Sequence, residues 1–212
     1  MPGPCGILST QSVMRRSCFT VWVLVSLLAV THAVWAFGLQ ASYGDSLNGQ
    51  PVTSLASPDA QAVVLLFVAT DCPLSNRYIP EIKRLEMKYA TQHVVFWFVY
   101  PNVGETGASV RQHEAAYGAE EHILLDPHHR LVDLTRVTVT PEAAVLVPQH
   151  SGTEPFRAVY HGRIDNRYIH IGLQRPSATQ FDLERAIVDV LQHHPVQRPD
   201  GPAVGCGIIG QP

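Results

Sequence analysis

The sequence predicts an α/β fold in which a central mixed β-sheet is flanked by helices. Apolar runs typical of buried strands alternate along the chain with stretches of helical periodicity, and this order favours parallel strands joined by helices. The last two core strands follow one another without a helix between them, so we expect them to pair antiparallel and to make the sheet mixed.

The expected strands are short and rich in β-branched and aromatic residues, as buried strands are. They cover residues 62–69, 93–100, 123–125, 143–147 and 156–161, with a further short strand near Val52. The first expected helix begins after Cys72 and buries a stripe that includes Ile79 and Ile82, while Pro80 inside it predicts a kink. Three more helices are expected at 108–117, 130–137 and 179–193.

Residues 1–36 have the pattern of a secretory targeting segment. The only two charges there are Arg15 and Arg16, an apolar run follows from Ser17 to Val30, and small residues end the segment at Val34-Trp35-Ala36. The apolar run is short for a membrane-spanning helix, which needs about 20 residues, so we expect a cleaved signal peptide. An uncleaved anchor that tethers the protein to a membrane through residues 17–36 is the alternative. Either way, the protein is expected to be exported to the periplasm or another extracytoplasmic space.

The remaining chain divides into a folded domain and a tail. Residues 37–195 carry all the predicted strands and helices, whereas residues 196–212 are rich in Pro and Gly and are expected to form a flexible C-terminal tail. The formal net charge of the chain is −3, which gives no basic footprint for nucleic acid.

Cys72 lies at the junction of a buried strand and a helix, a position that favours a reactive thiol. The free N–H groups and the dipole of a helix start stabilise an anion, and a thiolate is such an anion. Pro73 fits the first helical position, where its missing N–H does no harm. Asp71 acts in the opposite direction, because a neighbouring carboxylate disfavours the thiolate. We therefore expect Cys72 to be a nucleophile, with an inert buried cysteine as the alternative.

The segment VVLLFVATDCPLSNRYIPEIKRLEMKY resembles the strand, active-site turn and first helix of thioredoxin-like proteins. That family usually carries Cys-X-X-Cys in the turn; here the first cysteine is Cys72 and the second is replaced by Ser75. Pro80 matches the proline inside the family's helix, and Val139-Thr140-Pro141 resembles its cis-proline loop. The chain thus resembles the exported redoxin or AhpC-TSA (peroxiredoxin-like) type, with CxxS in place of CxxC. The resemblance implies a thioredoxin-like fold over roughly residues 45–195.

The sequence departs from the motifs of two thioredoxin-like families, and these departures argue against the activity of each family. A peroxiredoxin has Thr or Ser three residues before its reactive cysteine and Pro further upstream, but Ala69 and Leu65 stand at those positions. SCO-type copper chaperones carry Cys-X-X-X-Cys, but Asn76 stands where their second cysteine would be. A divergent peroxiredoxin and an SCO-like module for metal or respiratory-complex assembly remain as alternative functions.

The preferred interpretation is a thiol-dependent oxidoreductase that needs no cofactor or metal. Cys72 would attack a disulfide or an oxidised sulfur to form a mixed disulfide. Either Cys206, the only other cysteine beyond residue 36, or an external thiol would then resolve it. Thr140 and Pro141 would bind the substrate backbone, so the expected partner is a protein or small molecule that carries a thiol or disulfide. A static disulfide partner or a stray thiol is the alternative role for Cys206.

The remaining polar candidates have a structural and a functional interpretation each. Ser75 is expected to cap the helix or to make a hydrogen bond in its first turn. Arg77 and Tyr78 could steady a thiolate or a ligand, and the alternative is that they are solvated or packed. The histidine pairs 128–129 and 193–194 have no metal-binding spacing around them, so surface or turn positions are expected.

Overall fold

The computed structural model describes residues 42–117, 122–149 and 155–210. The predicted targeting segment 1–36, its cleavage site and the tether at 17–36 lie outside the described residues. Within the part that is described, no helix has the length and apolar character needed to cross a membrane.

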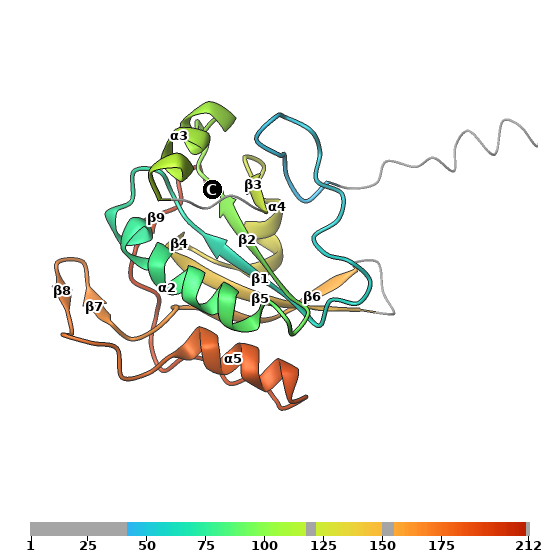
Figure 1. Cartoon of the computed structure of the whole chain (residues 1–212). Coiled ribbons are helices and arrows are strands. Elements are labelled where there is room, and N and C mark those ends of the chain that lie inside the picture. Colours follow the sequence, from blue (N-terminus) through green and yellow to red (C-terminus); the bar gives the residue numbers. More distant parts are fainter. Residues whose placement is uncertain (1–41, 118–121, 150–154, 211–212) are drawn as a thin grey trace, which may run out of the picture. The chain divides into compact units, whose positions relative to one another are not determined.

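A five-stranded sheet of order β3-β2-β1-β5-β6 forms the centre of the fold (Figure 1). Its strands are β1 (Ala62–Phe67), β2 (Val94–Tyr100), β3 (Ile123–Leu125), β5 (Glu142–Pro148) and β6 (Phe156–Gly162). The first three are parallel to one another, whereas β5 pairs antiparallel with β1 and with β6. The predicted α/β class with a mixed, helix-flanked sheet is therefore confirmed.

The helices of the described residues follow the predicted order. They are α2 (Pro73–Tyr89), α3 (Gly107–Tyr117), α4 (Arg130–Thr135) and α5 (Asp182–Leu191). The predicted helix at 130–137 ends two residues early, because Arg136 adopts a left-handed conformation with φ 65° that no α-helix continues. Pro80 lies within α2 as expected.

The two faces of the sheet bury two separate hydrophobic clusters. Successive residues of β1 point to opposite faces, so Val64 and Leu66 contact the cluster formed with α2 and α5, while Leu65 and Phe67 contact the cluster formed with α4. Every residue of β1 is buried, which explains its unbroken apolar run. Residues that precede the sheet, such as Tyr43, also pack into the second cluster. The carboxyl end of β1 is thereby fixed on both sides at the point where Cys72 follows.

Four short strands of the described residues lie outside the main sheet, and none was predicted as a strand. The strands β7 (Tyr168–His170) and β8 (Leu173–Gln174) form a small hairpin. The strand β9 (Cys206–Gly207) pairs antiparallel with β4 (Val139–Thr140), so part of the predicted flexible tail is a seated strand instead. Near Val52, where a short strand was expected, the structure has isolated bridges from Asp45 to Pro51 and Leu125.

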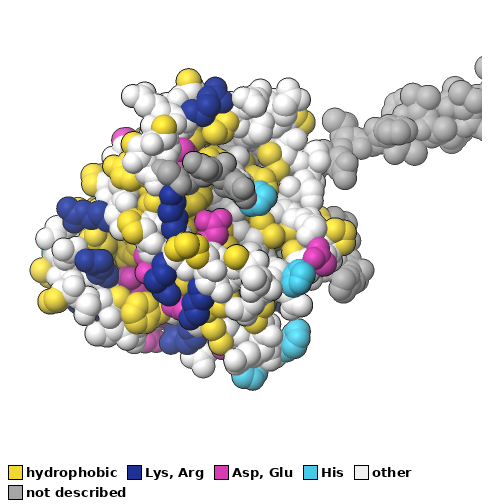
Figure 2. All heavy atoms as spheres, viewed as in Figure 1, with side chains coloured by type: hydrophobic (Ala, Val, Ile, Leu, Met, Phe, Trp, Pro, Cys, Tyr) yellow, Lys and Arg dark blue, Asp and Glu magenta, His cyan; other side chains and the backbone are white. Residues whose placement is uncertain are grey.

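Charged side chains of both signs are mixed on the face of the molecule that Figure 2 shows. Arg84 forms ion pairs with Glu81 and Glu184, and Glu184 also pairs with Lys88. These exposed pairs tie α2 to α5 across the surface, although each contributes little to stability.

Candidate active site

Cys72 is the N-cap residue of α2, and Pro73 follows at the start of the helix. The Cys72 backbone N–H donates to the carbonyl of Ala69 at 3.3 Å, which forms a tight turn between the end of β1 and the helix. The side chain is 0% exposed. The predicted position at a strand-to-helix junction is thus the observed one, and the sulfur lies inside the protein rather than on its surface.

The loop between β4 and β5 faces the Cys72 sulfur. The Thr140–Pro141 peptide bond is cis, and the Cys72 thiol donates to the Thr140 carbonyl oxygen at 3.1 Å. Glu142 fixes the backbone of this loop, because its Oε2 accepts the N–H groups of Thr138 and Val139 at 2.8 and 3.3 Å. The two segments that sequence reasoning placed opposite each other are therefore in contact.

The C-terminal strand brings the second cysteine to the same point. Cys206 pairs with Thr140 in the β4–β9 ladder, and its Sγ lies 2.8 Å from the Cys72 Sγ. The two residues are separated by 134 positions in the chain, and both are free thiols in this structure. The fold thus places a dithiol pair beside the cis-proline loop.

The surroundings of the two thiols drive their pKa values apart. Burial raises the pKa of Cys72, but hydrogen bonds from Cys206 and Ser75 outweigh it, and the net pKa lies below its ordinary value. Burial, the hydrogen bond to Cys72 and the charges of Cys72 and Asp71 together raise the pKa of Cys206 to about 12. At neutral pH, Cys72 is therefore the better thiolate of the pair and Cys206 holds its proton.

The other predicted residues of the turn have separate positions. Ser75 is fully buried, and its Oγ accepts the backbone N–H of Ala69 at 3.3 Å, so it fastens the turn to the helix. Asp71 and Arg77 are exposed, and Asp71 acts on the site through its charge near Cys206.

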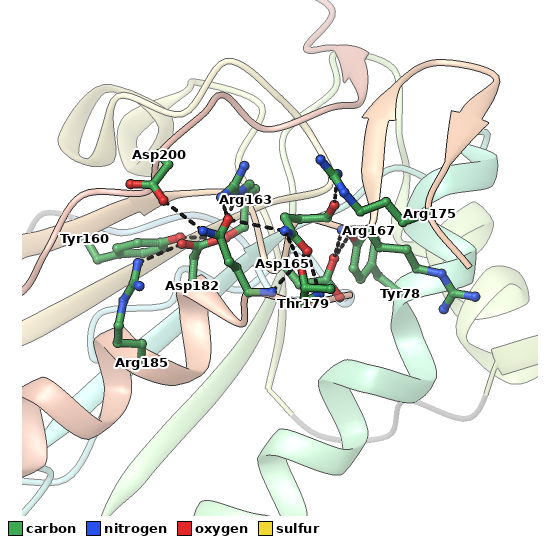
Figure 3. Close-up of polar contacts among 12 residues, drawn as sticks. Tyr78, Tyr160, Arg163, Asp165, Arg167, Arg175, Thr179, Asp182, Arg185 and Asp200 are labelled. Carbon is green, nitrogen blue, oxygen red and sulfur yellow. Dashed lines mark hydrogen bonds and ion pairs between the residues drawn. The ribbon is translucent and has the colours of Figure 1, made fainter. Parts of the chain in front are cut away.

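Tyr78 is buried and belongs to a polar network that joins α2 to the segment after β6. Its hydroxyl donates to Asp165 Oδ1 at 2.6 Å (Figure 3). In the same network Asp182 accepts from Arg163 and Arg185 at 2.6 and 2.8 Å.

The network also holds the start of the C-terminal segment. The Gln180 side chain donates to Asp200 Oδ2 at 2.9 Å, and Gly201 approaches Arg163 so closely that a Cβ there would lie 3.0 Å from Nη1. The chain that leads to β9 is thus anchored six residues before Cys206.

Two further side chains near the site were not predicted from the sequence. Glu105 Oε1 accepts the backbone N–H of Thr70 at 2.8 Å, and burial raises the pKa of this carboxyl. Asn102 is 6% exposed, and its Oδ1 accepts the Ile209 N–H at 2.8 Å. Both residues lie in the loop after β2, where the only available signal was a cluster of polar residues at the carboxyl end of a parallel strand.

The two histidine pairs differ in burial. His129 is buried and its Nε2 lies 2.9 Å from the Pro101 carbonyl oxygen, whereas its neighbour His128 is exposed. His193 and His194 are both exposed. Throughout residues 42–117, 122–149 and 155–210, no group of three or more His, Cys, Asp or Glu side chains is arranged to hold a metal ion.

The sheet order, the cysteine at the head of α2 and the cis-proline before β5 define a thioredoxin-like fold. No family model and no curated protein matches the chain. Among solved structures, an uncharacterized conserved protein from Geobacillus kaustophilus is 19% identical with a TM-score of 0.64, over 82% of this chain and 92% of that one. A hypothetical protein from Sinorhizobium meliloti 1021 is 22% identical with a TM-score of 0.63, over 80% and 91%.

A third solved structure belongs to a disulfide oxidoreductase. It is a secreted Mycobacterium tuberculosis disulfide oxidoreductase homologous to E. coli DsbE, 16% identical over 73% of this chain and 96% of that one, with a TM-score of 0.43. The proteins from Geobacillus kaustophilus and Sinorhizobium meliloti, with the higher TM-scores, share the fold of this chain.

Proposed function

We propose that this protein is a thiol–disulfide oxidoreductase in which Cys72 is the nucleophile and Cys206 the resolving thiol. The observation that carries the proposal is the 2.8 Å separation of the two sulfurs beside the cis-proline loop. The lowered pKa of Cys72 and the raised pKa of Cys206 support this division of roles, because the thiolate is the attacking species.

The reaction proceeds in two exchange steps. In the first, the Cys72 thiolate attacks one sulfur of a substrate disulfide; the substrate S–S bond breaks, and its second sulfur leaves as a thiolate and takes a proton. In the second, Cys206 loses its proton and attacks the Cys72 sulfur, which releases the first substrate sulfur as a thiol. The substrate gains two electrons and two protons, and Cys72 and Cys206 become a disulfide.

A second thiol-bearing molecule closes the cycle. A dithiol or two monothiols reduce the Cys72–Cys206 disulfide, and the same steps in reverse would oxidise a substrate dithiol. Ser75 cannot take part in this exchange because an alcohol forms no disulfide, so the resolving role falls to Cys206, whose sulfur faces that of Cys72.

Export is part of the proposal. An extracytoplasmic location rests on the targeting pattern of residues 1–36, and such compartments allow disulfides to form and persist. The expected substrates are proteins or small molecules that carry a disulfide or thiol.

Turnover of disulfides by cysteine variants tests the proposal. In a chain with Cys5 and Cys18 replaced by serine, reduction of insulin or glutathione disulfide is followed with dithiothreitol as reductant. We expect turnover in this background, background rates with Cys72→Ser, and a mixed disulfide trapped on Cys72 with Cys206→Ser. Equal turnover with and without Cys72, in variants whose thermal unfolding is unchanged, would refute the proposal.

A further inference from the structure

Five residues of the C-terminal segment, Gly205 to Ile209, lie along the β4 loop like a bound peptide. Cys206 and Gly207 form the ladder with Thr140 and Val139, and the Ile208 N–H donates to the Thr138 carbonyl at 3.4 Å. Beyond the ladder, the Ile209 N–H donates to Asn102 at 2.8 Å and its carbonyl accepts the Val103 N–H at 3.3 Å. Residues 138–140 together with Asn102 and Val103 thus hold the backbone of an extended segment from its cysteine to Ile209, and we call this binding surface the groove.

The groove admits only glycine immediately before the cysteine. A Cβ on Gly205 would lie 2.2 Å from the Thr140 carbonyl oxygen and 3.1 Å from the Pro141 nitrogen, both of them backbone atoms. Backbone atoms of a buried loop cannot rotate out of the way as a side chain can. Gly207, one residue after the cysteine, is different, because a Cβ there would meet no atom within 4 Å.

A second position selects for an apolar side chain. Ile208 is 8% exposed and belongs to the same hydrophobic cluster as Leu65 and Val132. Ile209, in contrast, is 56% exposed and is held through its backbone alone among the contacts described. The groove therefore distinguishes the residue before the cysteine and the residue two positions after it.

We propose that the groove along β4 binds an extended polypeptide segment of the type Gly-Cys-X-aliphatic, and that Gly205–Ile209 of the chain itself is an internal copy of this ligand. The inference rests on the proposed function of Cys72 and names its substrate class. A protein substrate must displace β9 to reach Cys72, and after exchange the return of β9 brings Cys206 to the mixed disulfide. Because the internal copy is tethered, it competes at an effective concentration of the order of millimolar.

The test uses peptides in which the cysteine carries a 2-pyridyl disulfide. The Cys72 thiolate attacks the peptide sulfur, the peptide–pyridyl S–S bond breaks, and pyridine-2-thione leaves and is measured by its absorbance. The parent peptide has the sequence of residues 203–209, Ala-Val-Gly-Cys-Gly-Ile-Ile. One variant peptide has Ala in place of the first Gly, and the matched control has Ala in place of the second.

The protein is the full chain with Cys5, Cys18 and Cys206 replaced by serine, so that Cys72 is the only thiol. It is compared with and without Gly205→Ala, which should unseat β9, and with Gly207→Ala, which should not. We expect Gly205→Ala to speed the reaction of the parent peptide, while Gly207→Ala has no such effect. We also expect the peptide with Ala before its cysteine to react about tenfold more slowly than the parent and the control peptide.

The same measurement with the pyridyl disulfide of glutathione separates the two proposals. If all peptides and the glutathione reagent react with Cys72 at similar rates, the inference about the groove is wrong and the proposed function stands. If Cys72 reacts with none of them in folded protein, the proposed function is wrong and the inference falls with it.

Discussion

The two cysteines face each other from regions that differ in how firmly they are packed. Cys72 lies between a fully buried central strand and a helix of 17 residues, and its turn is fastened by backbone hydrogen bonds and by Ser75. Cys206 lies in a strand of two residues at the edge of the domain, held by a few hydrogen bonds and one apolar side chain, Ile208.

Because of this difference, we expect Cys206 rather than Cys72 to be the thiol that moves. Segments with few buried apolar contacts open locally at a free-energy cost far below that of global unfolding. We therefore expect the β9 segment to open while the Cys72 turn stays folded. A resolving thiol needs this property, because it must leave room for a substrate and then return.

The largest expected effect contrasts two apolar residues of the same cluster. Leu65→Ala creates a cavity in the central strand and should lower the free energy of unfolding by about 2 to 5 kcal/mol. Ile208→Ala should lower it by less than about 1 kcal/mol, because β9 detaches before the domain unfolds. Denaturant unfolding measures both, and hydrogen exchange at the Ile209 amide should accelerate in Ile208→Ala. An equal loss of stability in the two variants would place β9 in the cooperative core and contradict the comparison.

A smaller effect should appear in the pH dependence of Cys72. Its reaction with a small disulfide accelerates as pH rises through the pKa of Cys72, since only the thiolate attacks. In Cys206→Ala, burial still raises that pKa while the hydrogen bond that lowers it is lost, so the acceleration should move to higher pH. Cys206→Ser keeps a donor and should fall between that variant and the parent. An unchanged pH profile in Cys206→Ala would show that Cys206 does not stabilise the thiolate.

The smallest expected effect concerns the hydrogen bond between Ser75 and the turn before α2. Ser75→Ala leaves the Ala69 N–H without its acceptor and should cost about 1 to 2 kcal/mol of stability. The matched control is Ser54→Ala, an exposed serine bonded to the Ala56 carbonyl, which should change stability by less than about 0.5 kcal/mol. Thermal unfolding of the two variants compares them directly, and equal stabilities would mean that the Ser75 hydrogen bond does not hold the turn.

The rigid side was largely predictable from the sequence. A continuous apolar run, a cysteine before a proline and a helical stripe are local signals, and local signals place β1, Cys72 and α2 within a residue or two. The pairing of β5 with β6 followed from the short turn between them. Only the ends of elements differ, as at Arg136, where a left-handed residue stops α4.

The segment that carries Cys206 was not predictable, because its structure depends on contacts between residues far apart in the chain. Nothing local in residues 196–212 indicates that Gly205 fits against the Thr140 carbonyl or that Asn102 receives the Ile209 N–H. The two isoleucines after Cys206 were the available signal, since an apolar pair at the end of a Pro- and Gly-rich segment favours docking over solvent exposure. The sequence predicted a flexible tail, whereas in the structure Cys206 and Gly207 form a strand paired with β4.

The most direct test of the account is the equilibrium of the two thiols with glutathione. The chain, with Cys5 and Cys18 replaced by serine, is equilibrated in buffers of increasing glutathione disulfide, alkylated and mapped by mass spectrometry. We expect one reversible oxidised species, the Cys72–Cys206 disulfide, which reduced glutathione converts back to two thiols in the folded protein. Glutathione attached to Cys72 without a bond to Cys206, or a Cys72–Cys206 disulfide that resists reduction until the protein unfolds, would contradict the exchange mechanism.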